Sequence, residues 1–270
     1  MVKIELYLNG AFITTAAPDY AALRAERNIT ADTLLINGHH RGWQTALADG
    51  DHALMFNAAQ TPSPALWQAI YQARYGKEVM RRLQMGQVAI CGLGGLGSLV
   101  AIELARLGVG RLLLIDGDTV DPTNLARQHY TISQIGQLKT QALATTLANF
   151  APLTQVETAT VWLNKDNIAP LLTDWPLICE CLDHPENKAL LTQTILTALP
   201  NATLVGSSGM AGYASGNAII SQQVLPHFYM VGDSESEGED GIGLMAPRVG
   251  LCASAQATLI MRLLLGEITP

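Results

Sequence analysis

The sequence predicts an α/β protein, with a Rossmann-like, mostly parallel sheet preceded by a small β-rich domain. Three observations indicate this. Apolar strand-like runs alternate with helical segments from residue 88 onward, a glycine-rich loop joins the first of these runs to its helix, and residues 1–57 have a strand–strand–helix–strand–strand pattern. Strands that alternate with helices favour βαβ units and a sheet buried on both faces.

The composition predicts a large core and argues against nucleic-acid binding. The chain has 270 residues, of which 49% are hydrophobic and 14% charged, whereas about a quarter of an average soluble protein is charged. This low charge content also favours an oligomer, with apolar surface buried at a subunit interface. The net charge of -7 argues against a sequence-independent nucleic-acid binder, because such proteins carry a basic face.

No segment predicts membrane insertion. The N-terminus MVKIELYLNG alternates like a strand and lacks the apolar core of a signal peptide. The most apolar segment, 249–266, contains Gln256 and Arg262 and is short for a membrane span, so we expect a buried helix there. The four cysteines lie in apolar segments, which favours packing over a disulfide framework and predicts a cytoplasmic location.

Residues 1–57 are expected to form a ubiquitin-like β-grasp domain. Two strand-like runs, KIELYLNG and AFITTA, meet at Asn9-Gly10, a dipeptide typical of tight hairpins. A helix follows, with Asp19 at its N-cap position. The runs TLLINGHHRG and HALMFN then supply further strands.

Residues 58–82 are expected to be a linker and a helix, and residues 83–270 a nucleotide-binding domain. Two prolines interrupt the segment AAQTPSPA, and helical spacing then runs from Leu66 to Leu83. In the second domain the expected strands lie near 88–91, 111–116, 155–161, 176–181 and 203–208. The expected helices lie near 97–107, 137–149, 166–173 and 186–198, with shorter strands and a loop before the last helix.

A glycine loop opens the second domain. Gly92, Gly94 and Gly97 match the pattern G-x-G-x-x-G between a strand and a helix, and Asp116 ends the following strand. Such glycines let backbone amides approach a phosphate at a helix N-terminus, and the acid can bind ribose hydroxyls. The motif predicts an adenosine-containing ligand, and it leaves NAD, FAD, S-adenosylmethionine and ATP open.

Polar residues after Asp116 favour a triphosphate. Asn124 and Arg127 should emerge at the carboxyl end of the sheet, where ligands bind in open α/β folds, and Lys139 falls in the first turn of the next helix. A cation is disfavoured at a helix N-terminus unless an anion also binds there. Isolated surface Lys and Arg residues are common, but three such groups after one nucleotide loop favour several phosphates.

Asp183 has two interpretations on sequence alone. It follows the apolar run LICECL, so it could hold Mg²⁺ against the phosphates. It also precedes a proline and a helical run, so it could instead cap that helix. The two roles fit about equally well.

Together these segments resemble the ThiF/MoeB superfamily, the bacterial relatives of ubiquitin-activating enzymes. The resemblance rests on GLGGLGS, DGDTVDPTNLARQ, IGQLKTQAL and the strand before Asp183, and it covers roughly residues 74–266. The segments SSGMAGYASGN and GLMAPRVG are most similar to a short ThiF subgroup without structural zinc. Residues 1–57 resemble ThiS, the β-grasp sulfur carrier.

The resemblance implies that the protein uses Mg-ATP to adenylate the C-terminal glycine of a ThiS-type sulfur-carrier protein, in the thiazole branch of thiamine synthesis. It implies catalytic roles for Arg127, Lys139 and Asp183, with Mg²⁺ at Asp183. In MoeB-like dimers an Arg of the partner subunit also reaches the triphosphate; Lys77 occupies that position here, and Arg74 lies one turn earlier. This habit of the family, together with the low charge content, implies a homodimer. The implied ATP-binding set is Gly92, Gly94, Gly95, Gly97, Asp116, Asp118, Asn124, Arg127, Lys139 and Lys77.

Three features depart from the family pattern. Paired CxxC motifs are absent, and Cys179 and Cys181 fit core packing, so no structural zinc is expected. No cysteine lies in the loop 232–245, which leaves any sulfur transfer to a separate donor protein. Residues 1–57 lack a C-terminal Gly-Gly, so this domain cannot be the substrate of its own enzyme.

Other functions stay open at this point. The protein could activate a carrier of the molybdopterin type or a small carboxylate, or it could bind carriers as a non-catalytic scaffold. An NAD-dependent oxidoreductase is a further alternative, but it would use only the glycines and Asp116. It would leave the basic residues and Asp183 without a role.

Overall fold

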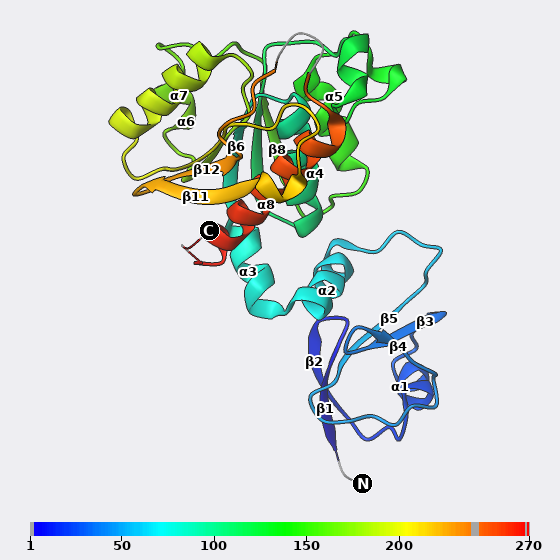
Figure 1. Ribbon diagram of the computed structural model, residues 1–270. Helices are drawn as coiled ribbons and strands as arrows, with labels where there is room; N and C mark the ends of the chain where they lie inside the picture. The colour runs from blue at the N-terminus through cyan, green and yellow to red at the C-terminus, as the bar shows by residue number, and fades with distance from the viewer. Residues whose placement is uncertain (1–2, 239–242, 268, 270) are drawn as a thin grey trace. The chain divides into compact units, whose positions relative to one another are not determined.

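The computed structural model describes residues 3–238, 243–267 and 269. It divides into two compact units, Met1–Arg81 and Arg82–Pro270. Each unit has its own sheet, of five strands in the first and seven in the second (Figure 1).

The first unit has the predicted β-grasp topology. Its strands are β1 (Ile4–Leu8), β2 (Ala11–Thr15), β3 (Thr33–Ile36), β4 (His39–His40) and β5 (His52–Phe56), in the order β2-β1-β5-β3-β4. Strands β1 and β5 are parallel, and the other pairs are antiparallel. Asn9 and Gly10 have φ of 49° and 84°, so they form the predicted tight turn between β1 and β2.

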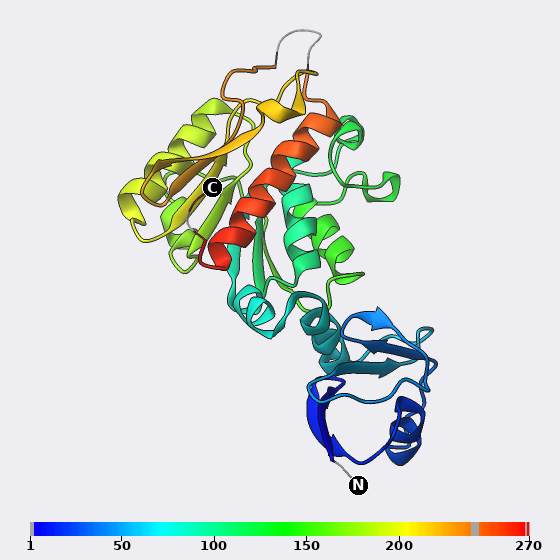
Figure 2. The same ribbon diagram turned by 60° about the horizontal axis from the view of Figure 1, so that its bottom comes forward.

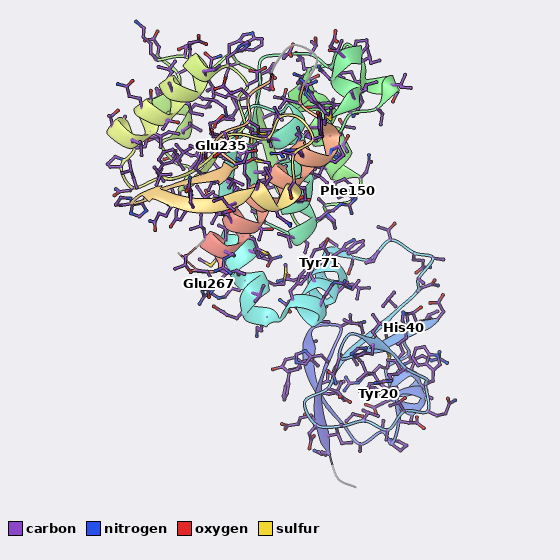
Figure 3. All side chains as sticks on the ribbon, viewed as in Figure 1. Tyr20, His40, Tyr71, Phe150, Glu235 and Glu267 are labelled. Atoms are coloured by element: carbon purple, nitrogen blue, oxygen red, sulfur yellow. The ribbon has the colours of Figure 1, made fainter. Side chains whose placement is uncertain are left out.

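Helix α1 (Tyr20–Glu26) packs on one face of this sheet. Asp19 caps it as predicted, because its Oδ1 accepts the Ala22 N–H at 2.8 Å. Tyr20, labelled in Figure 3, is fully buried, and its hydroxyl donates to Asp51 Oδ2 at 2.7 Å. The apolar core around it is Leu6, Leu8, Ala17, Leu23, Leu34, Ile36, Leu47, Ala53 and Met55.

The prediction of one continuous helix over 66–83 is wrong, because the helix is interrupted. The structure has two helices, α2 (Pro64–Tyr75) and α3 (Lys77–Met85), separated at Gly76. Gly76 has φ of 87°, a left-handed conformation that glycine adopts readily and that ends an α-helix. Helix α2 also begins two residues earlier than predicted, because Ser63 caps it and Pro64 fits its first turn.

The second unit contains the predicted parallel sheet. Its strands are β6 (Gln87–Cys91), β7 (Arg111–Ile115), β8 (Gln155–Ala159), β9 (Leu177–Glu180), β10 (Thr203–Ser207), β11 (Ile220–Leu225) and β12 (Phe228–Gly232). They are ordered β11-β12-β10-β9-β6-β7-β8, and only the edge strand β11 is antiparallel to its neighbour. The chain passes from β6 to β7 and β8, then returns to β9 on the other side of β6.

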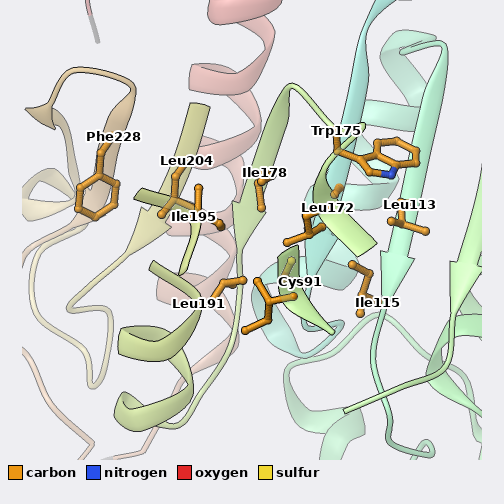
Figure 4. Close-up of a cluster of buried hydrophobic side chains, with 12 residues drawn as sticks. Cys91, Leu113, Ile115, Leu172, Trp175, Ile178, Leu191, Ile195, Leu204 and Phe228 are labelled. Carbon is orange, nitrogen blue, oxygen red and sulfur yellow. The ribbon is translucent and has the colours of Figure 1, made fainter. Parts of the chain in front are cut away.

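Helices cover both faces of the seven-stranded sheet. Helices α4 (Gly95–Leu107), α5 (Lys139–Ala148) and α8 (Ala246–Leu264) lie on one face, where α8 runs beside α4 (Figure 2). Helices α6 (Ile168–Leu172) and α7 (Pro185–Ala198) lie on the other. Figure 4 shows the core between α6, α7 and the sheet, which includes Trp175, Ile178 and Leu191.

The buried helix predicted over 249–266 corresponds to α8, in which Cys252 and Gln256 are fully buried. None of the described helices has the length and apolar character needed to cross a bilayer. The loop predicted over 232–245 precedes α8, and its residues 239–242 lie outside the described residues.

Candidate nucleotide-binding site

The site lies where the order of the parallel strands reverses. Strand β6 has β7 on one side and β9 on the other. The chain after β7 leads to α5 on one face of the sheet, and the chain after β9 leads to α7 on the other face. Such a switch point forms a crevice at the carboxyl ends of the strands, and ligands bind there in open α/β sheets. A cavity of about 350 Å³ occupies this position.

The glycines after β6 allow close backbone approach. Gly92 has φ of 91°, and a Cβ on it would lie 2.7 Å from the carbonyl oxygen of Cys181. A Cβ on Gly97 would lie 1.9 Å from the carbonyl oxygen of Gly92, so Gly97 packs the start of α4 against the loop. Gly94 is the N-cap of α4, and no side chain within the described segments caps this end. The first N–H groups of α4 are therefore free to bind an anion.

Asp116 ties the loop after β7 to the glycine loop. Its Oδ2 accepts the Leu93 N–H at 2.7 Å, and its Oδ1 accepts the Asp118 N–H at 2.8 Å. A carboxylate has about four lone-pair sites, so Asp116 retains sites for two hydroxyl donors. Asp116 lines the cavity, and its role as the ribose-binding acid stays a prediction.

Lys139 is a buried cation in the cavity wall. It is the first residue of α5, its side chain is 7% exposed, and its Nζ donates to Asp118 Oδ2 at 2.7 Å. Partial burial acts to raise the pKa of Asp118, but the hydrogen bond and the charge of Lys139 bring that pKa below its usual value. The ammonium has further donors, so an anion in the cavity can bind to it as well.

The turn after Asp118 places Arg127 at the cavity. Asp121 and Asn124 form a capping box around the 3₁₀ turn Pro122–Ala126, in which Asn124 Oδ1 accepts the Asp121 N–H at 3.0 Å. Asn124 is buried there and is not among the lining residues, whereas Arg127 lines the cavity. Within the described chain, the Arg127 guanidinium forms no ion pair with a carboxylate.

Gln128 is a site residue that sequence reasoning missed, although it lies inside the quoted motif. It is 8% exposed and lines the cavity. Its Oε1 is buried without a hydrogen-bond partner among the described residues. Buried polar atoms are normally satisfied, so a water or a ligand donor is expected at this atom.

Asp183 lies in the loop between β9 and α7 and lines the cavity. Strand β9 ends at Glu180, one residue before the end of the strand predicted over 176–181. The N-cap of α7 is His184, so the alternative interpretation of Asp183 as the N-cap is wrong. Asp183 accepts the His184 N–H at 2.9 Å, and its side chain is 80% exposed.

Glu180 and Lys188 form a buried ion pair beside Asp183. Glu180 is 2% exposed, and both of its carboxylate oxygens lie 2.8 Å from Lys188 Nζ. Lys188 also donates to the carbonyl and hydroxyl oxygens of Ser207, at 3.1 and 3.3 Å. Glu180 Oε1 accepts the Leu182 N–H at 2.7 Å, so the pair fixes the start of the loop that carries Asp183. Sequence reasoning missed both residues, because one acid and one lysine in a quoted segment carry no distinctive signal.

Cys179 and Cys181 are buried, as the core-packing prediction requires. Their sulfur atoms lie 3.5 Å apart, and Cys181 Sγ faces Gln256 Oε1 at 3.9 Å. Burial raises the pKa of the Cys181 thiol well above its usual value. Among the described residues, no three His, Cys, Asp or Glu side chains gather as a metal site.

The structure therefore brings together most of the predicted set. Eight residues of it line one cavity: Gly92, Gly94, Gly95, Asp116, Asp118, Arg127, Lys139 and Asp183. Gly97 and Asn124 are not lining residues. Gly97 packs the start of α4 against the glycine loop, and Asn124 bonds within the turn that precedes Arg127. Lys77 lies in the first unit, where it lines a cavity formed with β1, β5 and α2. The roles of these residues toward a ligand stay predictions.

Comparison with known proteins identifies relatives of the second unit. A family model described as the ThiF family matches residues 68–270. The adenylyltransferase and sulfurtransferase UBA4 of Lodderomyces elongisporus is 29% identical over 213 residues, which are 73% of this chain and 46% of that protein. The UBA4 protein of Candida albicans is 29% identical over 196 residues, or 70% and 44% of the two chains. The chain thus spans about half the length of the curated relatives it matches.

Solved structures show the same fold. The tRNA N6-threonylcarbamoyladenosine dehydratase TcdA of E. coli, in complex with ATP, matches with a TM-score of 0.68 and 19% identity over 77% of this chain and 98% of that one. E. coli MccB matches with a TM-score of 0.58 and 21% identity over 76% and 63%. These matches confirm the Rossmann-like fold of the second unit.

Proposed function

The chain belongs to the ThiF family, and we propose that it is an ATP-dependent adenylyltransferase that activates the C-terminal carboxylate of a ubiquitin-like carrier protein. One observation carries this proposal. A single cavity is lined by the glycine loop, the acid Asp116, the cations Arg127, Lys139 and Lys188, and the exposed carboxylate of Asp183. ATP with Mg²⁺ would supply phosphates for the glycine loop and the cations, ribose hydroxyls for Asp116, and a metal ion for Asp183.

Each part of ATP has a matching group in the cavity. The free N–H groups at the start of α4 would bind phosphate oxygens. Asp116 would accept the ribose hydroxyls. Arg127 and Lys139 would bind the triphosphate, and Asp118 would keep Lys139 aligned until ATP arrives. Gln128 Oε1, which lacks a partner among the described residues, would accept a donor from the ligand or from a water.

The chemistry needs charge stabilisation and no covalent enzyme intermediate. The carrier carboxylate attacks the α-phosphorus, a new P–O bond forms, and the bond to the leaving pyrophosphate breaks. Negative charge grows on the bridging and leaving oxygens, where Lys139 and Arg127 stabilise it. When bound, Mg²⁺ supplies further positive charge at the phosphates, and Asp183 would hold it, since Mg²⁺ is usually held by one or two carboxylates together with phosphates and waters.

The carrier we propose is a ThiS-type sulfur carrier ending in Gly-Gly, in thiamine thiazole synthesis. The ThiS-like pattern of the β-grasp unit and the short ThiF segments support this choice. The relatives named as adenylyltransferase and sulfurtransferase support adenylation of a sulfur carrier more generally. We also propose a homodimer, in which Lys77 or Arg74 of one subunit would reach the triphosphate of the other.

Intact-mass spectrometry of the carrier tests this function. A purified ThiS-type carrier is incubated with the protein, ATP and Mg²⁺, and a carrier lacking its last glycine serves as control. We expect the mass of an AMP adduct on the intact carrier only. An unmodified carrier, together with ATP binding, would point to a different carboxylate. Tight NAD binding without ATP binding would overturn the proposal in favour of an oxidoreductase.

A further inference from the structure

Trp162 is exposed although its neighbours anchor the loop that carries it. The loop follows β8, and Leu163 packs against the apolar core that α6 and α7 form with the sheet. Asn167 Nδ2 donates to the Trp162 carbonyl at 2.9 Å, which fixes the backbone. The Trp162 side chain nevertheless remains 67% exposed and lines the nucleotide cavity. Folding alone gives no reason to hold such a large apolar side chain outward, because tryptophans are highly buried on average.

One face of the indole is fixed against the backbone of Gly117. A Cβ placed on Gly117 would lie 2.7 Å from Cδ2 of Trp162, so only glycine lets the ring lie this close. The ring thus packs against the residue that follows Asp116, the acid proposed to bind ribose. Its exposure leaves the remaining ring surface open toward the cavity and solvent.

Trp162 and Asp116 both line the cavity and follow neighbouring strands of the sheet. Strands β7 and β8 are neighbours, with Ile115 paired to Ala159, so the loops after them leave the same edge of the sheet. The phosphates would lie over the glycine loop, the ribose at Asp116, and the base beyond the ribose. Val161 and Trp162 supply apolar lining on that side.

We propose that Trp162 is the residue on which the nucleotide base stacks, so that it selects ligands carrying a purine over phosphate chains without a base. This inference rests on the proposed function, because it takes ATP as the ligand. An aromatic plane that packs against the backbone on one side can present its other side to a base. Every base has a π-face, so the contact requires a base but no hydrogen-bond readout.

The alternative for an exposed tryptophan is contact with a protein partner. Trp162 lines the cavity, lies against Gly117 and follows the strand next to Asp116, and these three placements favour a base. A protein contact would predict that a Trp162 variant binds ATP normally and loses only its response to the carrier. The experiment below separates the two.

The test compares ATP with inorganic tripolyphosphate, by calorimetry and by tryptophan fluorescence, in the full-length protein. We expect ATP, but not tripolyphosphate, to quench fluorescence in the wild type, and Trp162→Phe to lose this quench while retaining most of the affinity. Trp162→Ala should weaken ATP binding by about fivefold to a hundredfold and leave tripolyphosphate binding unchanged. The Phe variant keeps an aromatic plane and controls for loss of the side chain.

Two results would overturn the inference while leaving the proposed function intact. One is unchanged ATP affinity in Trp162→Ala, which would assign the residue to a partner contact. The other is an equal loss of ATP and tripolyphosphate binding, which would make Trp162 a structural part of the loop. If the wild type does not bind ATP at all, the proposed function fails and the stacking inference fails with it.

Discussion

The ammonium nitrogen of Lys139 lies 2.7 Å from Oδ2 of Asp118, inside the cavity and almost fully shielded from solvent. A buried cation is costly unless it is paired, so Asp118 explains how the chain holds this lysine at the start of α5. The remaining donors of the ammonium can bind phosphate. The arrangement therefore presents a fixed positive charge at the place where charge would develop in adenylation.

Lys139→Met should lower the rate of carrier adenylation by about a hundredfold to a thousandfold, the usual effect of removing one donor that stabilises a developing charge. The fold should persist, because the Asp118 carboxylate is 45% exposed and water can solvate it. The rate is measured at saturating ATP, beside a thermal unfolding scan. Lys165→Met, which removes an exposed lysine outside the cavity lining, is the matched control. A wild-type rate in Lys139→Met would refute the role of this lysine.

Gly97→Ala should abolish nucleotide binding, whereas Gly250→Ala, in α8 and outside the cavity lining, should be tolerated. The added Cβ would lie 1.9 Å from the Gly92 carbonyl oxygen in the first variant, so the loop must move. In the second it would meet its nearest neighbour, Leu99 Cδ2, at 3.8 Å, an ordinary contact. Calorimetry with ATP measures both variants. Equal affinities would mean that the loop geometry does not control binding.

Lys188→Met should destabilise the second unit by about 3–5 kcal/mol, because it leaves the buried Glu180 carboxylate without its counter-ion. Adding Glu180→Gln should recover part of this loss, since no buried charge then remains. Urea unfolding measures both. Glu157→Gln removes the half-exposed pair with Arg111 and should cost less than about 1 kcal/mol. A loss in Lys188→Met no larger than that of Glu157→Gln would contradict the assignment of a buried pair.

Acid should weaken the second unit through Asp233. Its carboxylate pairs with Arg248 near the start of α8. Burial opposes ionisation, but the N–H groups of Ser236 and Glu235, the Ser236 hydroxyl and Arg248 together hold the pKa of Asp233 at about 2, below its ordinary 3.8. A lowered folded-state pKa stabilises the fold fully above the unfolded-state pKa, and this contribution is lost as the pH falls from about 4 toward 2.

The measurement is the stability difference between the wild type and Asp233→Asn, obtained by urea unfolding at about pH 6 and about pH 3. The difference should be larger at the higher pH and shrink as Asp233 becomes protonated. A difference that stays constant over this range would show that the ionised carboxylate contributes no stability through its lowered pKa.

Much of the fold could be predicted because it depends on local patterns. Apolar runs gave β6, β7, β9 and β10, and Asn9-Gly10 gave the first hairpin through its turn geometry. The break at Gly76 was missed, because helical spacing continues on both sides of it. A glycine within such a pattern can be tolerated or can end a helix, and only its φ of 87° decides this.

Site residues that belong to sequence motifs could be predicted, whereas site residues positioned by tertiary packing could not. Gly92, Asp116 and Lys139 follow from spacing along the chain. Trp162 and Glu180 depend on contacts between segments far apart in sequence, such as the indole against Gly117. Such contacts leave no spacing or periodicity in the sequence, so both residues could be identified only from the structure.

Exchange of radiolabelled pyrophosphate into ATP tests the central claim most directly. The reaction contains the protein, Mg²⁺ and a ThiS-type carrier, and Lys139→Met and Asp183→Asn proteins run beside the wild type. We predict exchange that depends on the carrier and collapses in both variants. Carrier-dependent exchange that survives in both variants would contradict the assigned roles. No exchange with the carrier, despite tight ATP binding, would contradict adenylation of this carrier class.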